Sequence, residues 1–257
     1  MLAKKASFYL WSALALVLVG AICMGAGCTR VTNPATQQEE IIFFDDSQET
    51  SIGEAIASDI ETQYHISQNP VYNQRVNRIG QQLVAVCERS NLPFQFKVIQ
   101  TDQINAFALP GGFIYVYEGL LDNADDEELA GVLGHEIGHI TARHGIKKLQ
   151  NNIGYGLLID LLLGDDPTTR GIADTAYSLV ILGYSRSNEF EADKLSVAYS
   201  HRAGLSPRGM ERFLQKIYTL EEREPSAIEI LVSTHPPTSE RIERVTEEIL
   251  RIQTSSS

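Results

Sequence analysis

The sequence predicts an α+β fold that is mostly helical, with one small sheet placed before a central helix. Two observations carry this prediction. Apolar residues recur at steps of three and four through most of residues 51–254, which is typical of amphipathic helices. Residues 94–117 instead hold three short runs rich in aromatic and β-branched residues, which is typical of strands. With 257 residues, 43% of them apolar, the chain can bury a substantial core in one domain.

The first 28 residues are expected to direct export. Residues 6–28 carry no charge, follow Lys4 and Lys5, and are numerous enough to span a bilayer. The run ends in small residues leading to Cys28, as in a bacterial lipoprotein signal whose cysteine becomes lipidated, although the leucine usual three positions earlier is a glycine. An uncleaved membrane anchor is the alternative. Either way the domain is expected on the periplasmic side of the cell envelope, and Thr29 favours anchoring in the outer membrane.

Charge and cysteine content exclude some partners. Loss of Lys4 and Lys5 with the signal, and of no acid, would take the formal net charge from −12 to −14. Such an acidic chain is a poor candidate for binding nucleic acid or anionic lipid. Of the three cysteines, only Cys87 would remain as a free thiol after signal removal and lipidation, so no intrachain disulfide is expected.

The segment after the signal is expected to lead into two helices. Residues 29–50 are rich in Asn, Pro, Gln, Thr and acidic residues, which predicts a flexible tether. Residues 51–54, Ser-Ile-Gly-Glu, have the pattern of a capping box and predict a helix over 51–66. Asn69-Pro70 predicts the start of a second helix that runs to about residue 89, with proline in its first turn.

The sheet and the remaining helices follow in order. The predicted strands cover residues 94–99, 106–109 and 113–117. Asn123, within an acidic run that suits a helix dipole, is the expected N-cap of the central helix. The very apolar residues 153–163 predict a buried helix or a cover over a cleft. Further helices are predicted over residues 173–203 with a break near 183, over 206–223, and over 239–252.

The central helix contains His135-Glu136-Ile-Gly-His139. Residues four apart on a helix differ in direction by only about 40°, so both histidines leave the helix from one side and could hold two corners of a zinc site. Glu136 points about 100° away from His135 and could act as a general base without coordinating the metal. The alternative is an ordinary helix with two surface histidines. Two glycines within the helix favour close packing of another backbone or room for a ligand.

A second helical segment offers carboxylates that could complete such a site. Glu189 and Asp193 are one turn apart, so both face the same way. One carboxylate could bind the metal while the other accepts a hydrogen bond from a ligand imidazole. Glu191 points elsewhere and is expected to be solvated. The alternative is that the whole acidic face is simply exposed to water.

Four motifs follow one another along the chain: Asn105-Ala-Phe-Ala-Leu-Pro-Gly-Gly112, His135-Glu-Ile-Gly-His139, the segment from Ser185 to Asp193, and His235-Pro-Pro. Together they resemble the zinc peptidase family of the CaaX prenyl endopeptidase and the heat-shock protease HtpX. The similarity covers roughly residues 50–250 and is closest to the periplasmic lipoprotein and outer-membrane quality-control members. It implies a zincin-like metallopeptidase domain over residues 51–254.

The resemblance also implies roles for individual residues. His135, His139 and Glu189 would bind one zinc ion. Glu136 would be the general base, and Asp193 would support a ligand histidine. The strand at Asn105-Ala106 is similar to the edge that pairs with substrate in related peptidases; a purely structural hairpin is the alternative.

Two further residues have open roles. His235 matches the family's active-site histidine, and could polarise the scissile carbonyl or occupy the open zinc position in a latent state. Arg241 could help stabilise an oxyanion or could be an ordinary helix-surface arginine. His65, His144 and His201 lie in no metal-ligand pattern and are expected at the surface or in the core.

These observations predict a membrane-tethered zinc endopeptidase that acts on misfolded or misassembled envelope proteins. A membrane-tethered chaperone or assembly factor with a structural zinc is the main alternative. A zinc hydrolase acting on something other than peptide is a third, which the candidate edge strand disfavours.

Overall fold

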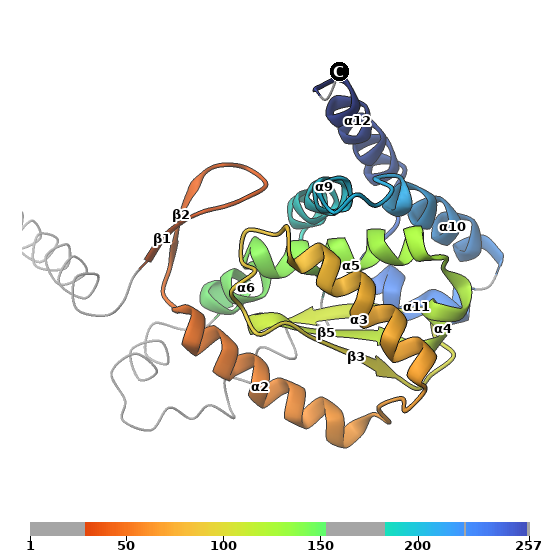
Figure 1. Ribbon diagram of the computed structural model, residues 1–257, viewed down its shortest axis with the longest axis horizontal. Helices are drawn as coiled ribbons and strands as arrows, with labels where there is room; N and C mark the ends of the chain where they lie inside the picture. The colour runs from red at the N-terminus through yellow and green to blue at the C-terminus, as the bar shows by residue number, and fades with distance from the viewer. Residues whose placement is uncertain (1–28, 153–182, 224, 256–257) are drawn as a thin grey trace, which may run out of the picture.

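The computed structural model describes residues 29–152, 183–223 and 225–255, and Figure 1 shows their arrangement. Helix α5 crosses the middle of the domain beside a three-stranded sheet, as expected for a mostly helical α+β fold, and that prediction is confirmed. The strands of this sheet are β3 (Gln95–Ile99), β4 (Ala106–Leu109) and β5 (Phe113–Tyr117). The helices are α2 (Asp46–Gln63), α3 (Pro70–Val84), α4 (Glu118–Asn123), α5 (Asp126–Thr141), α6 (His144–Asn152), α9 (Arg186–Arg202), α10 (Gly209–Arg223), α11 (Pro225–Thr234) and α12 (Ser239–Ser255).

The sheet has the order β3-β5-β4, which leaves β4 at an edge. β3 runs parallel to β5, whereas β4 runs antiparallel to it, with Ala106 opposite Val116 and Phe107 opposite Tyr115. The turn η1 (Pro110–Gly112) joins β4 to β5. Gly111 has φ of +78°, and a Cβ there would lie 2.5 Å from Thr50 Cα, so only glycine fits between this turn and α2.

The two faces of the sheet belong to different cores. One face, which includes Ala106 and Ala108, packs against α3 and α5 in the larger apolar cluster. The opposite face packs against α2 and α6 in a second cluster. Because successive strand residues point to opposite faces, Phe107 lies on the α2 side while its two neighbours face α5.

The structure contradicts the flexible tether predicted for residues 29–50. Strands β1 (Thr29–Thr32) and β2 (Glu39–Ile42) form an antiparallel hairpin, and Ile42 and Phe44 are fully buried. Helix α2 begins at Asp46, five residues before the predicted start, because Asp45 and Gln48 form the capping box in place of the expected one. The polar composition of residues 29–50 does not indicate this packing, because the packing depends on a few apolar residues that are buried against α6 and α2.

Other boundaries differ less. Asp125, not Asn123, is the N-cap of α5, and its carboxylate accepts from the backbone N–H groups of Glu127 and Glu128. Helix α11 was not predicted. The predicted segment 153–163 and residues 173–182 of the helix predicted over 173–203 lie outside the described residues, as does the signal over residues 1–28. The described remainder of that helix is α9, which begins after Gly183, where the break was predicted. Within residues 29–152, 183–223 and 225–255, no helix combines the length and apolarity needed to cross a bilayer.

Candidate active site

Helix α5 presents both histidines of the predicted metal motif. His135 and His139 are 3% and 1% exposed, and their Nε2 atoms lie 3.0 Å apart. Helix α9 reaches these histidines because its backbone lies against the α5 glycines: a Cβ on Gly138 would stand 3.1 Å from Ala192 Cα. The expectation that glycines in the metal helix admit another backbone is therefore confirmed.

This close packing brings Glu189 between the two imidazoles. Its Oε2 lies 3.5 Å from His135 Nε2, and its Oε1 lies 3.4 Å from His139 Nε2. Burial alone would raise the pKa of Glu189, but the neighbouring His235 and Arg241 outweigh it and hold the pKa well below its usual range. Glu189 is therefore a buried carboxylate held as an anion, as a metal ligand must be.

His235, in the loop after α11, completes a set of four donors. Its Nδ1 lies 3.1 Å from Glu189 Oε1 and 3.4 Å from His135 Nε2. One donor atom from each of His135, His139, Glu189 and His235 lies within 4.8 Å of all the others. Tetrahedral donors at about 2.0–2.1 Å from zinc stand roughly 3.3–3.4 Å apart, close to the separations observed here. The residues present thus fit a tetrahedral metal with nitrogen and oxygen ligands.

Glu136 lies beside this cluster without joining it. Its side chain is buried, its Oε2 has no hydrogen-bond partner among the described residues, and its Oε1 is 3.9 Å from His235 Nε2. Burial raises the pKa of the Glu136 carboxyl. A buried carboxylate with a free oxygen and a raised pKa is suited to accept a proton.

Asp193 and Arg241 support His135 from behind. Asp193 Oδ1 lies 2.9 Å from His135 Nδ1. The Arg241 guanidinium donates to both Asp193 oxygens, from Nε at 2.8 Å and Nη2 at 2.7 Å, and its Nη1 is 2.9 Å from Glu189 Oε2. Arg241 is 2% exposed, so the surface-arginine interpretation is wrong. Its contacts position the two carboxylates and neutralise their charge, a role that the oxyanion hypothesis did not include.

His139 has a support that the sequence interpretation missed. His144, fully buried, places its Nδ1 2.8 Å from His139 Nδ1 and its Nε2 3.2 Å from Glu191 Oε2. The Asn33 amide donates to the same Glu191 oxygen at 2.7 Å, which connects the N-terminal hairpin to the site. Glu191 is thus partnered and not simply solvated as predicted.

The five-residue spacing between His139 and His144 gives no indication in the sequence that the two side chains meet. Five residues along a continuous helix would turn it about 140° away from His139. However, α5 ends at Thr141, and Arg143 takes the left-handed conformation with φ of +55°, so α6 starts in a new direction that returns His144 to His139. The other two histidines without a motif, His65 and His201, are exposed and lie outside the site, as expected.

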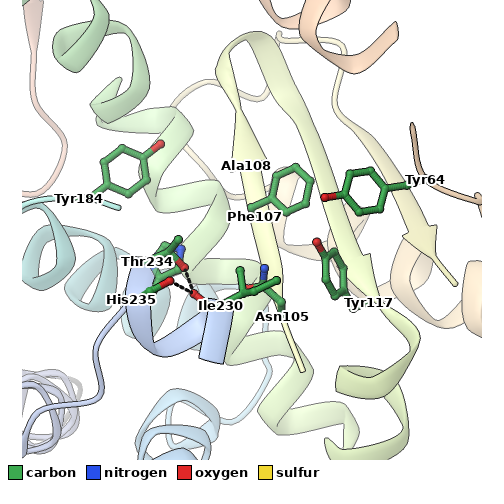
Figure 2. Close-up of a pocket in the computed structure, with 10 residues that line it drawn as sticks. Tyr64, Asn105, Phe107, Ala108, Tyr117, Tyr184, Ile230, Thr234 and His235 are labelled. Atoms are coloured by element: carbon green, nitrogen blue, oxygen red, sulfur yellow. Dashed lines mark hydrogen bonds between the residues drawn. The ribbon is translucent and has the colours of Figure 1, made fainter. Parts of the chain in front are cut away.

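The edge strand β4 runs past the same cluster. Tyr117 donates its N–H to the Asn105 carbonyl at 3.0 Å, so by antiparallel alternation the backbone groups of Ala106 and Ala108 face the open edge. The Asn105 side chain is 3% exposed, and its oxygen has no hydrogen-bond partner among the described residues. Figure 2 shows Asn105 on the pocket wall across from His235 and Thr234.

A helix with two metal-binding histidines and an intervening free glutamate, joined by a glutamate from a second helix, defines the metallopeptidase class. Residues 70–249 match the profile of Peptidase family M48, and the chain belongs to that family. The resemblance inferred from the four motifs is thereby confirmed.

Named relatives agree with this assignment. A Yersinia pestis "Beta-barrel assembly-enhancing protease" is 31% identical over 207 residues, which cover 76% of this chain and 42% of the relative. "Metalloprotease LoiP" of Escherichia coli is 26% identical over 239 residues, covering 90% of this chain and 92% of the relative. "Metalloprotease YcaL" of the same organism is 28% identical, covering 71% and 72%. The match therefore spans less than half of the first relative and most of the second.

Proposed function

We propose that this chain is a membrane-tethered zinc endopeptidase that hydrolyses peptide bonds in misfolded or misassembled envelope proteins. One observation carries the proposal: four protein donors converge within 4.8 Å of one another beside Glu136, whose Oε2 has no hydrogen-bond partner among the described residues. A zinc ion in this site supplies a Lewis acid that polarises a peptide carbonyl and acidifies water. His135, His139 and Glu189 would hold it.

The residues around the donors perform the remaining steps. A substrate segment pairs as an added strand with the open backbone groups of Ala106 and Ala108, and the Asn105 amide binds its backbone. Glu136 accepts a proton from the attacking water and returns it to the leaving amine. Asp193 and Arg241 fix the tautomer of His135 and the position of Glu189.

Glu136→Gln is the direct test. The substitution keeps the size of the side chain but removes the base, so zinc content and thermal unfolding should match wild type while casein cleavage is abolished. Glu136 binds no other described side chain through its Oε2, so folding has little reason to change. Wild-type cleavage that survives treatment with a strong chelator, or cleavage by the Glu136→Gln variant at the wild-type rate, would contradict the proposal.

One feature favours the chaperone alternative. Structural zinc sites fill all four positions with protein ligands, and His235 lies where it could provide the fourth.

We assign His235 to a latent state in which its imidazole must leave before water and substrate approach. His235→Ala should then cleave casein faster than wild type. A fall of about a hundredfold with zinc retained would instead assign His235 to polarising the carbonyl.

The membrane tether and substrate class are inferred from the signal and the relatives. The small residues before Cys28 support lipidation, and the name of the Yersinia relative supports a role in β-barrel assembly. Labelled palmitate should enter wild type but not Cys28→Ser, and only wild type should sediment with outer-membrane vesicles. Absence of label from both proteins would point to the uncleaved anchor, and equal labelling of both would point to another acylation site.

A further inference from the structure

A cavity of about 220 Å³ lies between the open edge of β4 and the end of α11, directly beside His235. Figure 2 shows its two sides: the rings of Tyr64, Phe107 and Tyr117 gather on one, and Thr234 and His235 lie across from them. The cavity is continuous with the candidate catalytic centre because His235 and Asn105 line it. No assigned role in the reaction requires the aromatic side of this cavity.

Two of the three rings on the aromatic side, Phe107 and Tyr117, are held by ring contacts. Phe107 stacks on Tyr115 with ring centroids 5.1 Å apart and planes at 16°, and it meets the edge of Tyr117 at 6.2 Å. Tyr64 closes the C-terminus of α2 and is 36% exposed. We call Tyr64, Phe107 and Tyr117 the aromatic wall. Rings already fixed by one another lose little freedom when a further ring packs on them.

The register of β4 directs a substrate side chain to this wall. The open backbone groups of Ala106 and Ala108 would bond an added antiparallel strand, which leaves Phe107 between them in a non-hydrogen-bonded pair. Side chains in such a pair are the closest across two strands and lie on the same face. The substrate residue opposite Phe107 therefore points its side chain at the aromatic wall.

Size and charge define what the cavity accepts. An apolar cavity of about 150 Å³ takes benzene, so this cavity has room for a phenyl or phenol ring. No lysine, arginine or carboxylate contributes to the residues described along its walls, and His235 is the one basic side chain among them. An acidic substrate side chain would lose its hydration here without gaining a cationic partner from lysine or arginine, and the ring faces return to a lysine ammonium group only part of the hydration that it loses.

We propose that the aromatic wall is a specificity subsite that binds an aromatic side chain of the substrate at a fixed number of residues from the scissile bond. The inference rests on the proposed endopeptidase function. It identifies the substrate class as extended segments with aromatic side chains exposed, which unfolded chains present and folded proteins bury.

Synthetic peptides test the register. A set of ten-residue peptides of alanine and serine carries one phenylalanine that moves by one position from peptide to peptide, with matched sets carrying aspartate or lysine. Cleavage sites are mapped by mass spectrometry with the wild-type protein. The cut should move with the phenylalanine, and kcat/KM should exceed that of the aspartate and lysine sets by about tenfold or more. Cuts that ignore the phenylalanine would overturn the subsite while leaving the endopeptidase intact.

Variants of the aromatic wall sharpen the test. Phe107→Ala and Tyr64→Ala should reduce the preference for phenylalanine to within about threefold of aspartate, given the loss of one packed ring. Tyr64→Arg should raise cleavage of the aspartate peptides, because a guanidinium would then face the cavity. Tyr218→Ala, an exposed tyrosine on α10 that is not among the cavity's lining residues, is the matched control and should keep the wild-type preference.

A binding measurement separates this inference from the proposed function. Peptide affinity for the Glu136→Gln variant does not depend on turnover. Tighter binding of phenylalanine than aspartate peptides, lost in Phe107→Ala/Glu136→Gln, supports the subsite even if wild type cleaves nothing, in which case the endopeptidase proposal alone fails. Equal binding of both peptide sets, together with equal cleavage, overturns the subsite.

Discussion

The two imidazoles on helix α5 lie one turn apart, yet the fold supports them in opposite ways. His135 rests on Asp193, which is itself bound by the Arg241 guanidinium, so its support is a buried ion pair from α9 and α12. His139 rests on His144, a second imidazole. Burial lowers the pKa of His144 more than its carboxylate neighbour raises it, so this imidazole is neutral near pH 7.

The two supports also end in different places. The ion pair behind His135 is enclosed in the core. The chain behind His139 passes through Glu191 to Asn33 in the N-terminal hairpin, whose Glu40 also pairs with Lys147 of α6. The segment closest to the proposed lipid anchor thus helps to hold His139, a proposed metal ligand. Leaving the buried Arg241 guanidinium without Asp193 costs more free energy than breaking the hydrogen bond between the imidazoles of His139 and His144. Removal of the His135 support should therefore destabilise the protein more than removal of the His139 support.

The largest effect is expected from Asp193→Ala. It removes the contact to His135 and leaves Arg241 buried with one carboxylate fewer, which should destabilise the metal-free protein by about 3–5 kcal/mol. Zinc affinity should fall by roughly 10–100-fold. Urea unfolding in chelator and zinc competition with a fluorescent chelator measure the two quantities. Glu240→Gln, at an exposed ion pair on α12, is the control and should change neither.

Acid should weaken the His144 support first. Because burial lowers the folded-state pKa of His144, the unfolded chain binds an extra proton below its pKa of about 6.5, and stability falls as pH drops from there. Burial raises the pKa of Asp193, but Arg241 and His135 outweigh it and lower the pKa, so that its contribution persists until pH falls below 3.8. In chelator, wild type should lose up to about 1–2 kcal/mol more stability between pH 7 and 5 than His144→Asn. Equal losses would show that His144 does not titrate as its burial implies.

His144→Ala tests the same support at constant pH. Without an acceptor for its Nδ1 proton, His139 is less well oriented, and zinc affinity should fall by about tenfold. His144→Asn, whose side-chain oxygen can accept that proton, should recover part of the loss. His201→Ala removes an exposed histidine from the end of α9 and should leave zinc affinity unchanged. Identical zinc affinities for all three variants would show that His144 does not help to orient His139.

The smallest effect is expected from Asn33→Ala. It breaks the 2.7 Å hydrogen bond to the Glu191 carboxylate, and a hydrogen bond to a charged group contributes about 1.5–3 kcal/mol to stability. Two further hydrogen bonds separate this contact from His139, so zinc affinity should fall by a few-fold at most. Glu39→Gln, exposed in the same hairpin, is the control. Proteolysis at the hairpin should become faster in Asn33→Ala than in the control if the hairpin is held by this contact. Unchanged proteolysis and zinc affinity would show that Asn33 does not contribute and that only His144 and Glu191 support His139.

The sheet and the long helices followed from the sequence because their signals are local. The strand at Ala106–Leu109 and the one at Phe113–Tyr117 were predicted with the bounds observed. Helix α2 was placed five residues late, since the Ser51 pattern resembles a capping box as well as the one at Asp45 does. The polar composition of residues 29–42 predicts a tether, whereas the hairpin found there is held by contacts with α6 that its composition does not indicate.

The sequence by itself determined that His135 and His139 face one way, because a helix fixes the direction of residues four apart whatever surrounds it. It also placed Glu189 and Asp193 on one helical face. Only the tertiary structure decided that His235 joins these donors and that His144 stands behind His139. Both arrive through turns, and the direction of a chain after a turn is set by long-range packing that no local pattern encodes.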